Sequence, residues 1–240
     1  RNDYPYGWTP DSKAVLFVSD RNRIQDIFRQ SIDQDSAELV VASPGNKDGP
    51  VVSPDGSWIL YRQHPADRPT RIMGVPVSGG TPQVVLEGRN INGHACARPP
   101  ATLCVYSEET PDGKQLIFSA FHAVQGKGRE LARVGLKQPT TLGYDWGLSP
   151  DGLRLAFTEV EERAGRIRVI PLAGGVAREV IVKGWFAFGW VGWAADGKGL
   201  FVAVVANPVT LLYVDLEGRA QVIWQQKRRA WIWTWCVPSP

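Results

Sequence analysis

Four short stretches of the chain share one pattern. They read "TPDSKAVLF" at 9–17, "SPDGSWILY" at 53–61, "SPDGLRLAF" at 149–157 and "AADGKGLFV" at 194–202. Proline presets φ for a turn, Asp and Gly suit the positions after it, and β-branched and aromatic residues favour a strand. The chain therefore repeats a unit in which a tight turn leads into an apolar strand.

The turns recur with a constant period. Pro10 and Pro54, Pro150 and Ala195, and Ala195 and the terminal Pro240 are each separated by about 45 residues. The interval between Pro54 and Pro150 has room for two such units. One further turn is therefore expected between them.

A fifth copy of the pattern, "TPDGKQLIF" at 110–118, does not fit this period. Glycine turns that close a later hairpin follow the other anchors by about 25 residues. Gly126 lies at that distance from Pro100 but much closer to Pro111. We therefore take Pro100 as the third anchor. The turn at 111–113 is predicted to join the second and third strands of its unit.

Units of about 45 residues with four short strands are typical of propeller blades. In the fourth unit the strands are expected at 144–149, 153–160, 166–172 and 178–182. No segment shows a convincing apolar period of 3.6 residues, so helix should be nearly absent. We predict an all-β chain, a β-propeller of four-stranded antiparallel blades.

The period also predicts how the domain is divided. Residues 1–240 are expected to form a single propeller domain of five complete blades, and an orphan first strand, "WIWTWCV", remains at 231–237. The predicted blade boundaries lie near residues 10, 54, 100, 150, 195 and 240.

The "SPDG" turn, the strand after it and the "VPVSGG" and "IPLAGG" hairpins together resemble the TolB-like branch of WD-type β-propellers. The resemblance covers essentially the whole chain. TolB-like propellers often have six blades or more, so five blades and one strand indicate part of a larger propeller. Ring closure normally pairs strands from the two termini.

Residues 96–134, "CARPPATLCVYSE…RELARV", are more particularly similar to the propeller of some bacterial serine/threonine kinases and winged-helix transcriptional regulators. In that family the propeller is an extracytoplasmic sensing or interaction domain and carries no catalytic residue. The resemblance therefore implies a periplasmic or cell-surface location. It implies neither kinase nor DNA-binding activity for these residues.

Charge and hydropathy exclude some partners. The net charge is +3 with both signs interspersed, which gives no electrostatic reason to expect nucleic acid as a partner. No apolar run approaches the roughly 20 residues that span a bilayer, so this chain is not expected to insert into a membrane. It lacks a signal peptide, opens on Arg1 and stops at "CVPSP", which indicates a processed chain or an excerpt.

The sequence contains no recognisable active site. His64, His94 and His122 are far apart and lack metal-ligand spacing, and no G-x-S-x-G motif is present. The aspartates of the repeated turns suit local hydrogen bonding to the backbone. We expect no enzyme activity, no cofactor and no metal ion.

Aromatic residues are the one signal of binding. Trp190 and Trp193 lie in "WFAFGWVGW", and Trp233 and Trp235 lie in "WIWTW", both near predicted first strands. First strands line the channel of a propeller. These residues either pack one blade against the next or form an aromatic rim for a peptide, glycan or partner loop. We predict that at least one of the four reaches the channel or its rim.

Cys96 and Cys104 flank the turn at the third anchor. In an antiparallel hairpin centred on Pro100 they would face each other, close enough for a disulfide. Such a bond would imply an oxidising compartment, in line with an extracytoplasmic domain. Cys236 is left unpaired, and three reduced thiols remain an equal alternative.

Three functions are compatible with this pattern. The favoured one is a non-catalytic interaction or sensory propeller that binds a protein, a peptide or a small ligand at the channel mouth. The alternative is the propeller of a larger prolyl-oligopeptidase-like peptidase, where it would gate substrate. A propeller lyase or glycosidase needs convergent His or carboxylate groups, and the scattered histidines argue against it.

Overall fold

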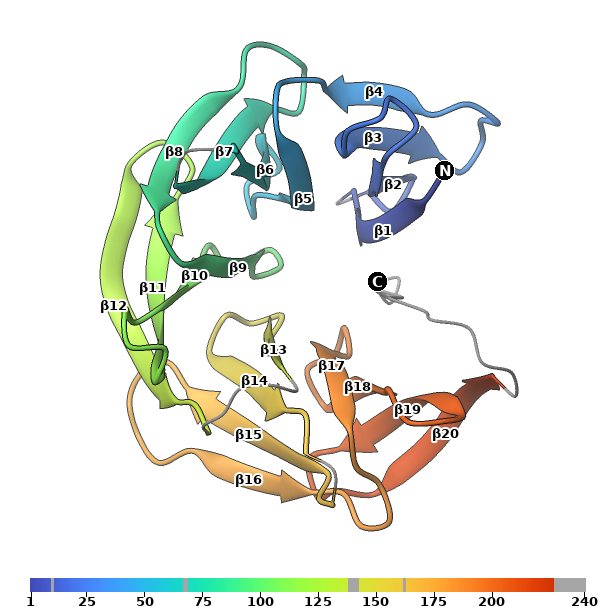
Figure 1. Cartoon of the computed structure of the whole chain (residues 1–240), viewed down its shortest axis with the longest axis vertical. Coiled ribbons are helices and arrows are strands. Elements are labelled where there is room, and N and C mark those ends of the chain that lie inside the picture. Colours follow the sequence, from blue (N-terminus) through green and yellow to red (C-terminus); the bar gives the residue numbers. More distant parts are fainter. Residues whose placement is uncertain (10, 67–68, 138–142, 162, 227–240) are drawn as a thin grey trace. The chain divides into compact units, whose positions relative to one another are not determined.

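A computed structural model describes residues 1–9, 11–66, 69–137, 143–161 and 163–226 (Figure 1). Those residues form twenty strands and no helix, and the strands make five separate four-stranded antiparallel sheets. The all-β prediction is confirmed. The chain divides into two compact units: unit 1 contains Arg1–Val134, and unit 2 begins at Gly135.

Unit 1 holds three of the sheets, each in sequential strand order. The first is β1 (Asp3–Trp8), β2 (Ala14–Ser19), β3 (Asp26–Ser31) and β4 (Glu38–Val41). The second is β5 (Asn46–Val52), β6 (Trp58–His64), β7 (Thr70–Pro76) and β8 (Gln83–Gly88). The third is β9 (Ile91–Cys96), β10 (Cys104–Glu109), β11 (Gln115–His122) and β12 (Gly126–Gly135), whose last residue begins unit 2.

Unit 2 holds the other two sheets. The fourth sheet is β13 (Tyr144–Leu148), β14 (Arg154–Glu159), β15 (Arg166–Pro171) and β16 (Arg178–Ile181). The fifth is β17 (Phe188–Trp193), β18 (Gly199–Val204), β19 (Val209–Asp215) and β20 (Ala220–Gln226). The four strands predicted for the fourth unit are thus confirmed. The expected strand at 231–237 and the anchors Pro10 and Pro240 lie outside the described residues.

The repeated turns form for a local reason. In the second sheet the Ser53 hydroxyl donates to the Asp55 carboxylate, which also accepts a hydrogen bond from the Ser57 backbone N–H at 3.2 Å. Gly56 takes the left-handed φ of +74° that closes the turn. The bond from Ser53 holds the pKa of Asp55 below its usual value. The turn aspartates therefore act on their own backbone, as the sequence predicts.

The turn at 110–114 confirms the period. It joins β10 to β11, the second and third strands of the third sheet, whereas the anchor turns at Pro54 and Pro150 join first and second strands. The hairpin that contains Pro100 joins β9 to β10. Turns with the same Pro-Asp-Gly sequence thus occupy two different places in a blade.

The core of each unit lies between neighbouring sheets. In unit 1, Leu16, Ile27, Ile59 and Tyr61 belong to one cluster of buried side chains from the first two sheets. In unit 2 a single cluster of thirteen buried residues joins the fourth and fifth sheets. Burial of apolar side chains on both faces of a sheet is the main source of its stability.

A buried ion pair also links the first two sheets. Lys47 on β5 is 0% exposed, and its ammonium lies 2.8 Å from a carboxylate oxygen of Asp26 on β3. The ammonium also donates to the backbone carbonyls of Ser43 and Gly45. All three of its protons thus have acceptors, which is the condition for burying an ammonium.

Candidate functional site

The first strands of the three sheets in unit 1 lie next to one another. β5 contacts both β1 and β9 (Figure 1). They bring together polar side chains that are far apart in the sequence. We call this set the first-strand cluster, and it consists of Tyr6, Asp48, Arg62, His64 and His94.

Asp48 is the centre of the cluster. It is the direct cross-strand partner of Arg62, whose Nε lies 2.7 Å from its Oδ1. Nε2 of His64 lies 3.1 Å from its other oxygen. Burial opposes ionisation of this carboxyl, but the hydrogen bonds and charge of His64 and Arg62 outweigh burial and lower its pKa.

Arg62 extends the cluster to the third sheet, because its guanidinium also donates to the backbone carbonyl of Asn92 on β9. Its side chain is only 14% exposed. Tyr6 extends the cluster to the first sheet through a hydrogen bond with the backbone of Gly49. Burial, followed by the negative charge of Asp48, raises the pKa of Tyr6 to about 12.

His94 lies beside this network. Its Nε2 is 3.4 Å from the backbone oxygen of Leu60, so Nε2 carries the proton and donates. Its Nδ1 is buried and has no hydrogen-bond partner. Burial, together with the positive charge of Arg62, lowers the pKa of His94 to about 4. The imidazole is therefore neutral over the physiological range.

Unit 2 presents aromatic residues on its first strands. Trp146 on β13 and Trp190 on β17 are half-buried. Trp193 is only 5% exposed, and its indole N–H donates to the backbone oxygen of Gly147 at 3.1 Å. The guanidinium of Arg154 lies 4.6 Å from its ring centroid. Trp193 thus packs the fourth sheet against the fifth.

The prediction that an aromatic reaches the rim therefore rests on Trp190 among the described residues. Trp233 and Trp235 lie outside them. That Trp190 contacts a ligand stays a prediction.

Sequence reasoning missed the first-strand cluster apart from noting its two histidines. A signal was present, because Tyr6, Asp48 and His94 each lie a few residues before an anchor turn, on a predicted first strand. Their association depends on which sheets are neighbours, which one chain segment does not reveal. Arg62 lies on a second strand and has no such signal.

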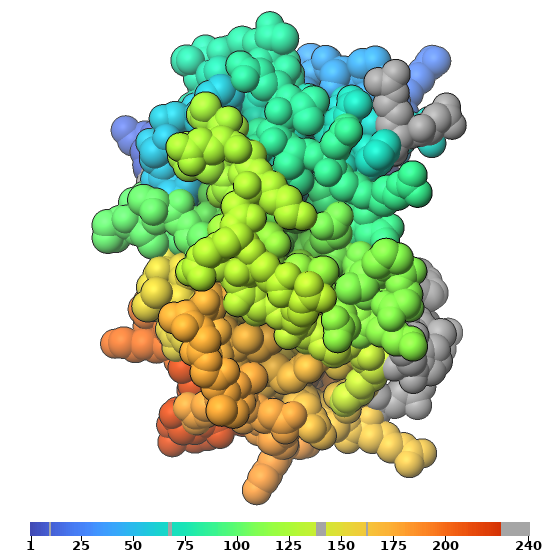
Figure 2. Space-filling model, turned by 90° about the vertical axis from the view of Figure 1, so that its left-hand side faces the viewer, coloured from blue at the N-terminus to red at the C-terminus, as the bar shows by residue number. Residues whose placement is uncertain are grey.

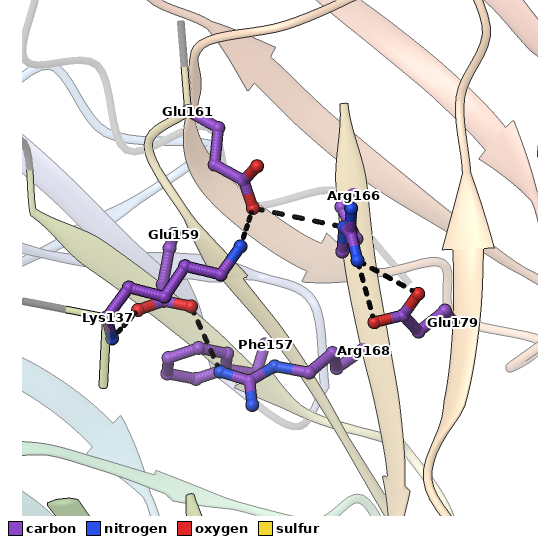
Figure 3. A pocket seen from close by; sticks show the side chains of 7 residues that line it. All are labelled: Lys137, Phe157, Glu159, Glu161, Arg166, Arg168 and Glu179. Carbon is purple, nitrogen blue, oxygen red and sulfur yellow. Dashed lines mark hydrogen bonds and ion pairs between the residues drawn. The ribbon is translucent and has the colours of Figure 1, made fainter. Parts of the chain in front are cut away.

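A small pocket of about 70 Å³ lies in unit 2 (Figure 3). Three cations and three carboxylates alternate around it, with the ring of Phe157 beside them. The lining residues are Lys137, Phe157, Glu159, Glu161, Arg166, Arg168 and Glu179.

Every charge in this pocket already has a partner. Lys137 binds Glu161 at 2.6 Å, Arg166 binds Glu179 at 3.1 Å, and Arg168 binds Glu159 at 3.1 Å. The backbone N–H of Lys137 donates to Glu159 at 2.7 Å. A ligand would have to displace these contacts. The arrangement instead holds the segment around Lys137 against the fourth sheet.

Cys96, the last residue of β9, and Cys104, the first residue of β10, are direct cross-strand partners. Their Cα atoms are 4.0 Å apart and the sulfur atoms are at bonding distance. The hairpin geometry therefore suits the predicted disulfide. That the bond forms in the native protein stays a prediction.

Within the described ranges, no three or more His, Cys, Asp or Glu side chains are grouped so that they could hold a metal ion. The part of the chain that the structure describes also has no helix long and apolar enough to cross a bilayer.

Comparison with solved structures identifies the fold as a β-propeller. The chain aligns with a chain of a nidogen/laminin complex at a TM-score of 0.65 and 16% identity, over 91% of this chain and 77% of that one. It aligns with a putative TolB from Agrobacterium tumefaciens at a TM-score of 0.61 and 18% identity, over 93% and 80%. The predicted TolB-like propeller fold is therefore confirmed.

Enzymes also contain this fold. A puromycin hydrolase aligns at a TM-score of 0.62 and 12% identity, over 92% of this chain and 37% of that one. At these identities the likeness to solved structures concerns the fold alone.

Sequence comparison is less informative. No protein-family model matches the chain. An uncharacterized protein of Agrobacterium fabrum (strain C58) is 36% identical over 58 residues, which is 24% of this chain and 20% of that protein. The chain thus matches only a fifth of the length of this curated relative.

Proposed function

We propose that the chain is a non-catalytic interaction or sensory propeller that binds a peptide or a loop of a partner protein at the first-strand cluster. The observation that carries this proposal is the convergence of three sheets on one partly exposed polar group. Asp48 and His64 keep 23% and 38% of their side chains exposed, while Arg62 binds Asp48, which in turn binds His64. First strands border the channel of a propeller, where such modules commonly bind.

The chemistry of the first-strand cluster favours a ligand that has both hydrogen-bond donors and hydrogen-bond acceptors. Asp48 offers a carboxylate, Arg62 and His64 offer N–H groups, and Tyr6 offers an aromatic ring with a hydroxyl. A peptide backbone, with alternating N–H and C=O groups, matches this mixture better than a purely anionic or apolar ligand.

The test is a selection of peptides from a random displayed library on the immobilised chain. Each enriched peptide is then titrated by calorimetry against purified variants. Arg62→Ala should weaken binding by at least about tenfold, because it removes the side chain that orders Asp48. The matched control is Arg71→Ala on β7, whose guanidinium pairs with Glu87 away from the cluster.

Binding that is equally strong in both variants would place the site elsewhere and overturn the proposal. Failure of the selection to enrich any peptide would overturn it as well.

A sensory role and an extracytoplasmic location belong to the same proposal. Both rest on the similarity of residues 96–134 to the propellers of bacterial kinases and winged-helix regulators, together with the cysteine pair of the β9–β10 hairpin. The adjoining domains of the parent protein would distinguish this role from others.

The second candidate is a propeller that gates substrate to a peptidase domain. The alignment with a puromycin hydrolase favours this candidate. The chain aligns with 37% of that enzyme, as expected for a propeller that is one part of a larger peptidase. A G-x-S-x-G hydrolase domain in the parent protein would support this candidate. A transmembrane span joined to a kinase or winged helix would support the first.

A further inference from the structure

The outer strand of the fifth sheet differs from the other four in charge. Outer strands have one unpaired edge, and charged side chains normally protect it from pairing with another chain. Strand β12, yellow-green in Figure 2, lies open on the surface and carries four exposed charged residues. β20, with the sequence "AQVIWQQ", carries none. The charged residues on the outer strands are Glu38 on β4, Glu87 on β8, Lys127, Arg129, Glu130 and Arg133 on β12, and Arg178 and Glu179 on β16.

β20 also exposes apolar side chains at its centre. Val222, Ile223 and Trp224 are 47%, 49% and 47% exposed. One edge of β20 pairs with β19, and within the described residues its other edge has no partner. An uncharged, apolar edge without proline is the kind that recruits another strand.

The order of residues in β20 is self-complementary. An antiparallel second copy centred on Ile223 would oppose Ile223 to itself and Val222 to Trp224. The same register would oppose Gln221 to Gln225, so that amides meet amides. From Gln221 to Gln225, apolar groups thus meet apolar groups and amides meet amides, with no charge in the strand. Only the end pair, Ala220 with Gln226, is mixed.

We propose that β20 pairs with β20 of a second copy of this chain to form a symmetric dimer. Antiparallel pairing of two identical edges gives a twofold interface in which the same surface serves both partners. Self-complementarity favours a second copy over an unrelated strand, because β20 already offers matching residues to an antiparallel copy of itself.

The bulge in β20 shapes this interface. The ladder with β19 passes from Val222 to Trp224 and skips Ile223. A bulge twists the strand and interrupts the regular hydrogen bonding. The intermolecular hydrogen bonds would therefore form on both sides of the bulge, at Gln221 and Gln225. The contact at the centre would consist of apolar side chains.

Sedimentation velocity of the whole 240-residue chain over a wide concentration range tests the proposal. The wild type should pass from monomer to dimer as its concentration rises. Ile223→Lys should raise the dissociation constant by at least about tenfold, because two like charges would face each other. The matched control is Val84→Lys on β8, an outer-strand valine that is 51% exposed. It should dimerise as the wild type does.

A charge-swap experiment tests the register. Ile223→Lys and Ile223→Glu should each be monomeric alone and should form a mixed dimer when combined, because residue 223 faces its own copy. A wild type that stays monomeric at every concentration would overturn the proposal, whether the edge is open or is covered by another part of the same chain. A dimer that survives Ile223→Lys, or is lost equally in Val84→Lys, would overturn it too. Two lone variants that do not combine would refute the register centred on Ile223, and with it the proposed interface.

Discussion

Replacing His94 by glutamine tests the electrostatics of the first-strand cluster. Folding buries the imidazole beside Arg62 and lowers its pKa from 6.5 to about 4. Between pH 6.5 and about 4, His94 is therefore protonated in the unfolded chain and stays neutral in the native state. The histidine contributes fully to stability above pH 6.5. That contribution falls as the pH drops towards about 4, because the unfolded state then binds more protons.

The magnitude follows from the shift in pKa. One pKa unit corresponds to about 1.4 kcal/mol, so the shift is worth at most about 3 kcal/mol of unfolding free energy. Glutamine cannot titrate, and its amide N–H can still donate to the backbone oxygen of Leu60. Below pH 6.5 the wild type should therefore lose up to about 3 kcal/mol more than His94→Gln.

Urea unfolding at a series of pH values between neutrality and about pH 4 measures this difference. The matched control is His122→Gln, which replaces an exposed histidine at the end of β11 and should leave the acid sensitivity in place. If the wild type and His94→Gln lose unfolding free energy in parallel, the burial of a neutral imidazole beside Arg62 is not the cause, and the reasoning is refuted.

Three further predictions concern stability. Lys47→Met should cost about 3–5 kcal/mol of unfolding free energy, because Asp26 stays buried without its cation; a loss below about 1 kcal/mol in urea unfolding would contradict this. Non-reducing peptide mapping of natively expressed protein should find Cys96 joined to Cys104. Replacing both cysteines by serine should lower the free energy of unfolding by roughly 2–3 kcal/mol. Free thiols at both positions in the mapping would contradict the disulfide and count against an extracytoplasmic location. Trp193→Phe should cost about 1–2 kcal/mol in thermal or urea unfolding, because it removes the indole N–H donor; an unchanged midpoint would show that this hydrogen bond is dispensable.

Much of the fold was predictable because its signals are local. A turn such as that at 53–57 is specified by its own hydroxyl, carboxylate and glycine, which contact one another within a few residues. The period of these turns then sets the number of strands. The period also distinguishes the turn at 110–114 from the anchor turns at Pro54 and Pro150, which resemble it in sequence but differ in spacing. The pairing of Cys96 with Cys104 was likewise predictable from the symmetry of one hairpin.

The candidate site was not predictable in the same way. Tyr6, Asp48 and His94 belong to one cluster only because three sheets lie side by side. No single segment of the sequence reveals that β1, β5 and β9 are neighbours. Burial decided the charge states as well, since the same imidazole would titrate normally in an unfolded chain.

Sequence alone thus determined the all-β class, the four-stranded unit, the places of the turns near Pro54, Pro100, Pro111 and Pro150, and the facing cysteines, because each depends on contacts within about one unit. Only the tertiary structure decided that Lys47 is buried against Asp26, that Trp193 is a packing residue, and that Arg62 donates to Asn92 of the third sheet. Those outcomes depend on which surfaces of different sheets meet. Side-chain burial and charge pairing across such surfaces arise only when the sheets are assembled.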